Sequence, residues 1–278
     1  MKTKIIIILA FIMSVVFYQN FAGDKTIKQD GDGQSNNQSA IFEPDGEDIT
    51  GETSVENDGA QLLSDIENNK KSYSNFYSKG PGNIKKISLT FDDGPGRSTD
   101  FVLKLLKEKN VKATFFLLGT QVEKNPKLAK RILEEGHEIG NHTYSHLNFY
   151  SYSESSRAEV IERELMKSGK ILSRVLGINP RLVRYPNGYS KPDALEIAER
   201  YGYKVINWSF GEDWKRKIKN GQMYSQYLRA VSNGAILLFH DTHKNSKSLS
   251  FLPKLIDEIK KRKYEIATVS ELLSLDDK

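Results

Sequence analysis

The sequence contains no cysteine among its 278 residues. This absence excludes disulfide bonds, thiolate metal ligands, cysteine nucleophiles and lipid attachment through a cysteine side chain. A metal ion in this protein would therefore need ligands from histidine, aspartate or glutamate. Histidine is also scarce, with only five present, so their positions along the chain are informative.

Long apolar runs are rare as well. The longest runs from Ile5 to Tyr18, and its 14 residues fall short of the ~20 that a membrane-spanning helix needs. It follows a start with two lysines and precedes small residues, which is typical of an export signal. We expect residues 1–22 to be a signal peptide, with an uncleaved membrane tether through residues 5–18 as the alternative. The protein would then be exported to the periplasm, the cell wall or the medium.

Charge is unevenly distributed along the chain. Residues 24–70 hold twelve acidic residues and three lysines, which leaves a net charge of about +12 on residues 71–278. We interpret residues 23–80 as an acidic disordered linker and residues 81–278 as the folded domain. A basic solvated surface is the simplest interpretation of that domain, ahead of an anionic partner such as an envelope polymer. No nucleic-acid motif is present, and the oligomeric state is assumed to be monomeric.

Strand-like and helix-like segments alternate through the second part of the chain. Strands are expected at residues 86–91, 113–118, 137–142, 180–185, 204–210, 234–240 and 264–269. Helices are expected at residues 101–109, 127–135, 153–176, 191–201 and 251–262. Such alternation predicts parallel strands and an α/β fold. About seven repeats suit an irregular (β/α)7–8 barrel better than a full eightfold one, although periodicity alone also allows an open sheet.

Chemically reactive side chains follow the ends of these strands, where both architectures place active sites. The stretch LTFDDGP ends a strand with the adjacent Asp92 and Asp93, and the histidines fall in GHEIGNHTYSH and LFHDTH. His142 and His146 have the i, i+4 spacing that can chelate one ion. On its own this spacing more often marks two surface histidines than a metal site, but a nearby carboxylate favours a metal site. Either aspartate could be the third ligand, which leaves the other to take a proton from water.

Two histidines and one carboxylate suit Zn²⁺, or another divalent ion such as Co²⁺ or Ni²⁺. The stretches TFDDGP, HTYSH, RYPNG, DW and LLFH follow one another in this order. Together they resemble a NodB-type polysaccharide deacetylase of the fourth carbohydrate esterase family, over roughly residues 84–273. This resemblance implies the irregular barrel of that family and a metal-dependent hydrolase.

The resemblance also assigns the first group of site residues. It implies that Asp92 is the general base and that Asp93 is a metal ligand together with His142 and His146. Arg184, in RYPNG, would pair with Asp92 and keep it ionised and oriented.

A second group of residues would act on the substrate. The resemblance implies that the backbone N–H of Asn187 helps to hold the oxyanion, and that His240 is the general acid, oriented by Asp213. Trp214 and Leu238 would line the small pocket for the acetyl methyl group. An imidazolium held by a carboxylate can supply the proton that a leaving amine needs.

One position departs from the family pattern. The family often carries a further aspartate three residues before the Asp-Trp pair, and here that position is Phe210. Some family members that act on the muramic acid of peptidoglycan also lack this acid and keep the DWK found here at residues 213–215. The departure therefore concerns the identity of the substrate more than the hydrolytic step.

The sequence thus predicts an N-deacetylase for the amino sugars of an envelope polysaccharide, most plausibly N-acetylglucosamine or N-acetylmuramic acid in peptidoglycan. Chitin oligosaccharides, poly-N-acetylglucosamine and acetylated xylan are alternatives within the same chemistry. A catalytically silent relative that binds glycan is the rival from another class, and a small-molecule amide hydrolase is a third interpretation.

Overall fold

The computed structural model describes residues 73–215, 217–242 and 246–275. The expected signal peptide and all but the last residues of the expected linker lie outside this part of the chain, as does His243. In the part that is described, no helix combines the length and the apolar character needed to cross a membrane.

The centre of the fold is an eight-stranded sheet in which every pair of neighbouring strands is parallel. The strands are β1 (Phe76–Tyr77), β2 (Lys86–Gly94), β3 (Thr114–Leu117), β4 (Glu138–Asn141), β5 (Leu182–Val183), β6 (Lys204–Ile206), β7 (Ile236–His240) and β8 (Glu265–Ala267). Their order is β1-β6-β5-β4-β3-β2-β7, and β8 pairs with the start of β2. The expected α/β fold with parallel strands is confirmed.

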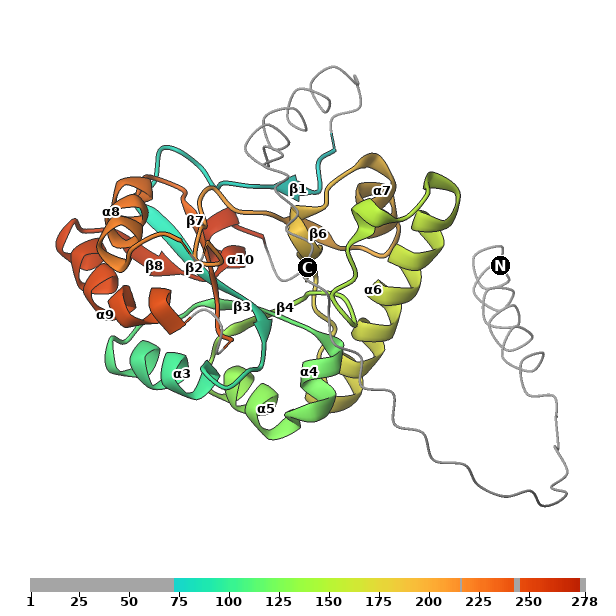
Figure 1. Cartoon of the computed structure of the whole chain (residues 1–278), viewed down its shortest axis with the longest axis horizontal. Coiled ribbons are helices and arrows are strands. Elements are labelled where there is room, and N and C mark those ends of the chain that lie inside the picture. Colours follow the sequence, from blue (N-terminus) through green and yellow to red (C-terminus); the bar gives the residue numbers. More distant parts are fainter. Residues whose placement is uncertain (1–72, 216, 243–245, 276–278) are drawn as a thin grey trace, which may run out of the picture. The chain divides into compact units, whose positions relative to one another are not determined.

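Helices flank this sheet (Figure 1). They are α3 (Thr99–Glu108), α4 (Gly119–Lys124), α5 (Pro126–Glu134), α6 (Glu154–Leu176), α7 (Pro192–Arg200), α8 (Asn220–Ala230), α9 (Ser246–Lys261) and α10 (Val269–Leu273). Local sequence explains several boundaries, because α5 starts with a proline in its first turn and α6 ends at Gly177 with a φ of 71°, where glycine adopts the left-handed conformation without strain.

The segment after β6 closes the sheet into an irregular barrel. The backbone N–H of Ser209 donates to Ile236 at 2.9 Å, and the N–H of Leu238 donates to the carbonyl of Phe210 at 2.9 Å. The Phe210 ring packs edge-on against Tyr227, with 4.9 Å between centroids. The phenylalanine at the departing position therefore belongs to the closing seam and the core around it.

The alternation of side chains along β2 separates the core from the site. Ile87, Leu89 and Phe91 are fully buried in the largest apolar cluster, which includes residues of the surrounding helices. Thr90 and Asp92 point to the opposite face, as alternate residues of a strand must. This face is the interior of the barrel, and its carboxyl end carries the polar groups described below.

Residues before position 81 also belong to the fold. The N–H of Val205 donates to Asn75 at 2.7 Å, and the N–H of Asn207 donates to Tyr77 at 2.8 Å, so that β1 pairs with β6. A strand of two residues has too little periodicity to be recognised in a sequence. The helices α4, α8 and α10 were likewise not expected, because they are short or contain few apolar residues.

We predict that Gly140→Ala destabilises the barrel interior. A Cβ at Gly140 would lie 2.5 Å from Cε1 of Phe116, a fully buried ring, and overpacking of this kind costs about 1–3 kcal/mol. Chemical denaturation measures the loss. Gly221→Ala is the matched control, because a Cβ there meets nothing within 4 Å and should leave stability unchanged or raise it. Equal midpoints for Gly140→Ala and the unmodified chain would contradict the prediction.

Candidate active site and metal centre

Two adjacent carboxylates reach the same site because the strand that carries them is irregular. In a regular strand Asp92 and Asp93 would point to opposite faces. The register between β2 and β3 shifts between Asp92 and Gly94, and Asp93 has a φ of 69°. A bulge of this kind re-aims a side chain, and here it brings both carboxylates to His142, whose Nε2 lies 3.8 Å from Asp92 and 3.4 Å from Asp93.

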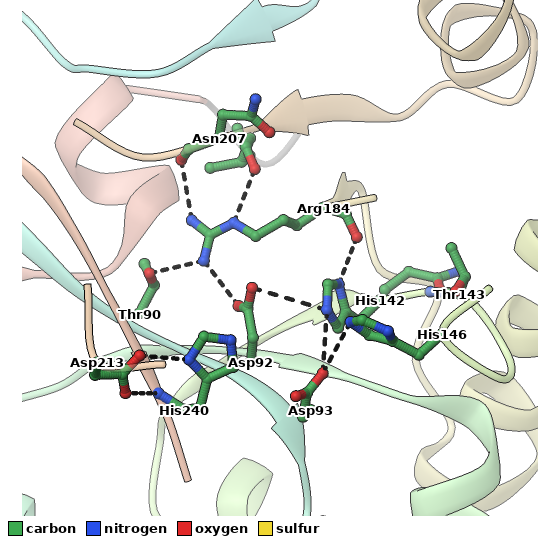
Figure 2. A network of polar contacts seen from close by, with 12 residues as sticks. Thr90, Asp92, Asp93, His142, Thr143, His146, Arg184, Asn207, Asp213 and His240 are labelled. Atoms are coloured by element: carbon green, nitrogen blue, oxygen red, sulfur yellow. Dashed lines mark hydrogen bonds and ion pairs between the residues drawn. The ribbon is translucent and has the colours of Figure 1, made fainter. Parts of the chain in front are cut away.

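Asp93, His142 and His146 form a cluster that could hold a metal ion (Figure 2). Oδ1 of Asp93 lies 3.4 Å from Nε2 of His142 and 3.3 Å from Nε2 of His146. Ligand atoms about 2.0–2.1 Å from a tetrahedrally bound ion are separated by about 3.3–3.4 Å. This Oδ1 is also buried and has no hydrogen-bond partner among the described residues. The residues present therefore fit a divalent metal ion.

The hydrogen bonding of His142 presents the correct nitrogen to such an ion. Its Nδ1 lies 2.6 Å from the carbonyl oxygen of Arg184. A carbonyl can only accept, so Nδ1 carries a proton, and Nε2 is the nitrogen that faces Asp93 and would bind an ion once its own proton is lost. Orientation of a ligating imidazole by a carbonyl is common at metal sites.

The charges of Asp93 and His142 stabilise each other, whereas burial and the charge of His142 lower the pKa of His146. Burial alone would raise the pKa of Asp93, but the contact with His142 and the charges of both histidines hold that pKa well below its usual range. Burial lowers the pKa of His142, whereas the charges of Asp92 and Asp93 oppose this effect and raise it overall. The carboxylate of Asp93 is therefore held in its ionised form.

Arg184 holds Asp92 from the other side (Figure 2). Its side chain is completely buried, and its Nη1 donates to Asp92 and to Thr90 at 2.8 Å each. The remaining donors bind the carbonyls of Ile206 and Asn207, at 2.9 and 3.0 Å. All of these bonds fix the guanidinium in place, so the carboxylate of Asp92 is aimed by a rigid, positively charged partner.

His240 lies at the end of β7, beside Asp92 on the neighbouring strand β2. Its Nδ1 donates to Oδ1 of Asp213 at 2.6 Å, and its backbone N–H donates to the other oxygen at 2.8 Å. Burial lowers the pKa of His240, but Asp213, together with the charges of Asp92 and Asp93, outweighs burial and raises the pKa to about 9. The imidazole is therefore protonated near neutral pH.

The other expected site residues lie around these groups. The Trp214 ring packs edge-on against His240 with 5.8 Å between centroids, and it is 43% exposed. Leu238 is buried and lies two residues before His240 on β7, so the two side chains are on the same face of the strand. Asn187 lies in the short 3-10 turn Pro186–Gly188, with a φ of 57°.

One histidine lies away from the site. His137 precedes β4, at the opposite end of that strand from His142, and its ring packs edge-on against Phe115. Its Nδ1 accepts the N–H of Ala113 at 3.3 Å. Burial and the charge of Lys112 lower the pKa of His137 to about 4, so it is a neutral residue of the core.

Several residues that shape the site were not recognised in the sequence. Thr90 binds Arg184, Ser248 donates to Asp213 at 3.1 Å, and Glu164 accepts two hydrogen bonds from the loop between the metal-site histidines. A signal existed for Glu164 alone, because it falls among the buried positions of α6 and a charge on an apolar helix face is unusual.

Comparison with known proteins finds that this chain is similar to one group of proteins. A family model described as polysaccharide deacetylase matches residues 79–206. A peptidoglycan-N-acetylglucosamine deacetylase of Bacillus cereus is 37% identical over 197 residues, which cover 69% of this chain and 90% of that protein.

Solved structures agree with this comparison. The Bc1960 peptidoglycan N-acetylglucosamine deacetylase matches with a TM-score of 0.67 and 33% identity, over 72% of this chain and 92% of that one. A CE4 family pseudoenzyme from Bacillus anthracis, BA3943, matches with a TM-score of 0.65 and 29% identity, over 73% of this chain and 70% of that one.

We predict that Asp213→Asn lowers the pKa of His240 from about 9. The amide keeps the size of the side chain but removes the charge that opposes burial, and the loss of such a partner lowers a pKa by about 1–3. Titration of the imidazole signals by NMR, in metal-free buffer, measures the change. His137 is the internal control and should still titrate near 4. A pKa for His240 that stays near 9 in the variant would refute this electrostatic account.

Proposed function

This chain belongs to the polysaccharide deacetylase family, and we propose that it removes acetyl groups from the amino sugars of peptidoglycan in a metal-dependent hydrolysis. The observation that carries the proposal is the division of the aspartate doublet. Asp93 faces the two histidines, whereas Asp92 is held by Arg184. A metal-dependent deacetylase needs these two roles in one site, one carboxylate to bind the ion and one to take a proton.

The named relatives support N-acetylglucosamine as the sugar that is deacetylated. The Bacillus cereus protein and Bc1960 both carry this sugar in their names. N-acetylmuramic acid is the alternative, because Phe210 replaces the acid that is frequent in the family. Chitin oligosaccharides, poly-N-acetylglucosamine and acetyl-xylan would require the same chemistry.

We propose that Asp93, His142 and His146 hold the metal, with Zn²⁺ as the first choice and Co²⁺ or Ni²⁺ as alternatives. Such an ion acts as a Lewis acid toward a carbonyl oxygen and lowers the pKa of water. Support comes from the short distances between the three ligand atoms and from the unpartnered Oδ1 of Asp93.

Asp92 is the proposed general base. Its carboxylate takes a proton from the attacking water as the water oxygen bonds to the acetyl carbon. Arg184 places a positive charge beside Asp92 and fixes its direction through a 2.8 Å hydrogen bond. The backbone N–H of Asn187 is the proposed donor to the oxyanion that develops on the acetyl oxygen.

His240 is the proposed general acid. Its imidazolium gives a proton to the sugar nitrogen as the bond between carbon and nitrogen breaks, which releases acetate and a free amine. Asp213 holds the proton on this imidazole by raising its pKa. Leu238 and Trp214 would pack against the acetyl methyl group, since one is buried directly below His240 and the other contacts its ring.

A silent glycan-binding relative is the rival proposal. It has a specific precedent, because one structural neighbour is named a pseudoenzyme. The proposed base, metal ligands and acid of this chain are all present and assembled, which favours catalysis. Loss of one of these groups would be the usual mark of a silent relative.

Export is a further part of the proposal. Action on a cell-wall polymer requires the enzyme to leave the cytoplasm, and residues 1–22 have the pattern of a signal peptide. The residues between that segment and β1 would link the catalytic domain to it. We propose no oligomeric partner and treat the chain as a monomer.

We predict that the N-terminus of the protein recovered from the cell envelope or the medium begins near residue 23. Sequencing of the N-terminus by mass spectrometry measures this directly. A full-length chain in the membrane fraction would instead indicate an uncleaved tether through residues 5–18.

We predict that the purified protein releases acetate from peptidoglycan in the presence of Zn²⁺ or Co²⁺, and that Asp92→Asn lowers kcat by about 10²–10⁴ because a general base contributes that much. Metal affinity should change little in this variant, since Asp92 is held by Arg184. Mass spectrometry of the digested product identifies the sugar that has lost its acetyl group.

Acetate release separates the two proposals, whereas glycan binding does not. An active enzyme and a silent relative would both bind glycan after Asp92→Asn, so binding serves as the control for folding. No acetate release from any of the candidate polymers with either metal would argue strongly for the silent relative.

A further inference from the structure

Glu164 is a buried acid that the proposed reaction does not use. It lies on α6 with a relative exposure of 5%, among the apolar residues of the inner face of that helix. No described lysine, arginine or histidine forms an ion pair with it. Burial of a carboxylate without a counter-charge is costly, so its position requires a reason.

The carboxylate of Glu164 binds one residue with both of its oxygens. The backbone N–H of Ser145 donates to Oε2 at 2.7 Å, and Oγ of Ser145 lies 3.0 Å from each oxygen. Ser145 sits between His142 and His146, directly before the second histidine. Glu164 therefore anchors α6 to the loop at Ser145, the residue directly before His146.

That loop has a conformation which needs external support. Thr143 has a φ of 68° and His146 a φ of 61°. The left-handed region is disfavoured for residues with a side chain, and most of all for a β-branched one. Oδ1 of Asn141 accepts the N–H of Thr143 at 2.8 Å and secures the start of the loop, whereas Glu164 secures its end.

The two histidines differ in how firmly they are held. The His142 side chain is 2% exposed and is tied to the carbonyl of Arg184. The His146 side chain is 34% exposed. Its direction therefore depends more on the backbone that carries it, which is the backbone anchored at Ser145.

We propose that Glu164 is a positioning residue for metal binding, which through Ser145 holds His146 in the conformation that faces Asp93. The inference rests on the proposed metal-dependent function. It names a residue outside the three ligands on which the affinity for the ion depends. The hydrogen bonds carry the effect, so a side chain that retains an acceptor oxygen should retain most of the affinity.

The experiment is a titration of the metal-free full chain with Co²⁺. The visible absorption of the bound ion reports how much Co²⁺ is bound at each step. Glu164→Ala should weaken Co²⁺ binding by about 10–100-fold, the usual cost of losing a group that orients a ligand. Glu164→Gln keeps an acceptor for Ser145 and should weaken it less than about 5-fold.

Glu162→Ala is the matched control on the same helix. Glu162 binds Tyr201 and Arg200 on the outer surface, and its removal should leave Co²⁺ affinity within about twofold. Unfolding of each metal-free variant, measured in the presence of a chelator, shows whether that variant is folded. If Glu164→Ala does not fold, Ser145→Ala takes its place, because it removes the hydroxyl that lies 3.0 Å from both oxygens of Glu164 and leaves the ligands intact.

Two results would overturn the inference: a folded Glu164→Ala variant with unchanged Co²⁺ affinity, or a Glu164→Gln variant that binds as weakly as Glu164→Ala. At saturating Co²⁺ the alanine variant should regain most of its kcat, which a general structural defect would not allow. Because Co²⁺ binding is measured without substrate, an inactive but metal-binding protein would refute the proposed function and leave this inference standing.

Discussion

Two neighbouring carboxylates in one strand repel each other and, in regular geometry, point apart. The bulge at Asp93 removes the second obstacle, because the left-handed backbone at this residue turns its side chain toward the same site as that of Asp92. The groups around the two carboxylates reduce the repulsion between them. Arg184 is buried against Asp92, and the two histidines lie against Asp93. Each carboxylate therefore has its own partners, and the two can have different tasks.

The rest of the site depends on the parallel sheet that carries this bulge. His240 on β7 is the direct partner of Asp92 on β2, so the proposed acid and base lie across neighbouring strand ends. Arg184 follows β5, and His142 follows β4, which places both at the same edge. Parallel strands bring their carboxyl ends together, and groups far apart in the sequence thus meet in one place without long loops.

Much of this arrangement could be predicted from the sequence. The strand that carries Asp92, the spacing of His142 and His146 and the glycine that ends α6 can all be recognised in short stretches of sequence. The positions of β1 and of the seam at Phe210 could not be predicted, because both depend on pairing between distant segments. The role of Glu164 was hidden for a related reason, since its partner Ser145 lies on a loop whose path only the folded chain defines.

The division of labour between the two aspartates is the central claim. Anomalous X-ray diffraction from crystals grown with Co²⁺ would test it most directly, because it locates the ion without any assumption about activity. The account predicts one ion bound by the carboxylate of Asp93 and by Nε2 of His142 and His146, with Asp92 still bonded to Arg184. An ion coordinated by Asp92 instead of Asp93, or located away from the two histidines, would contradict it.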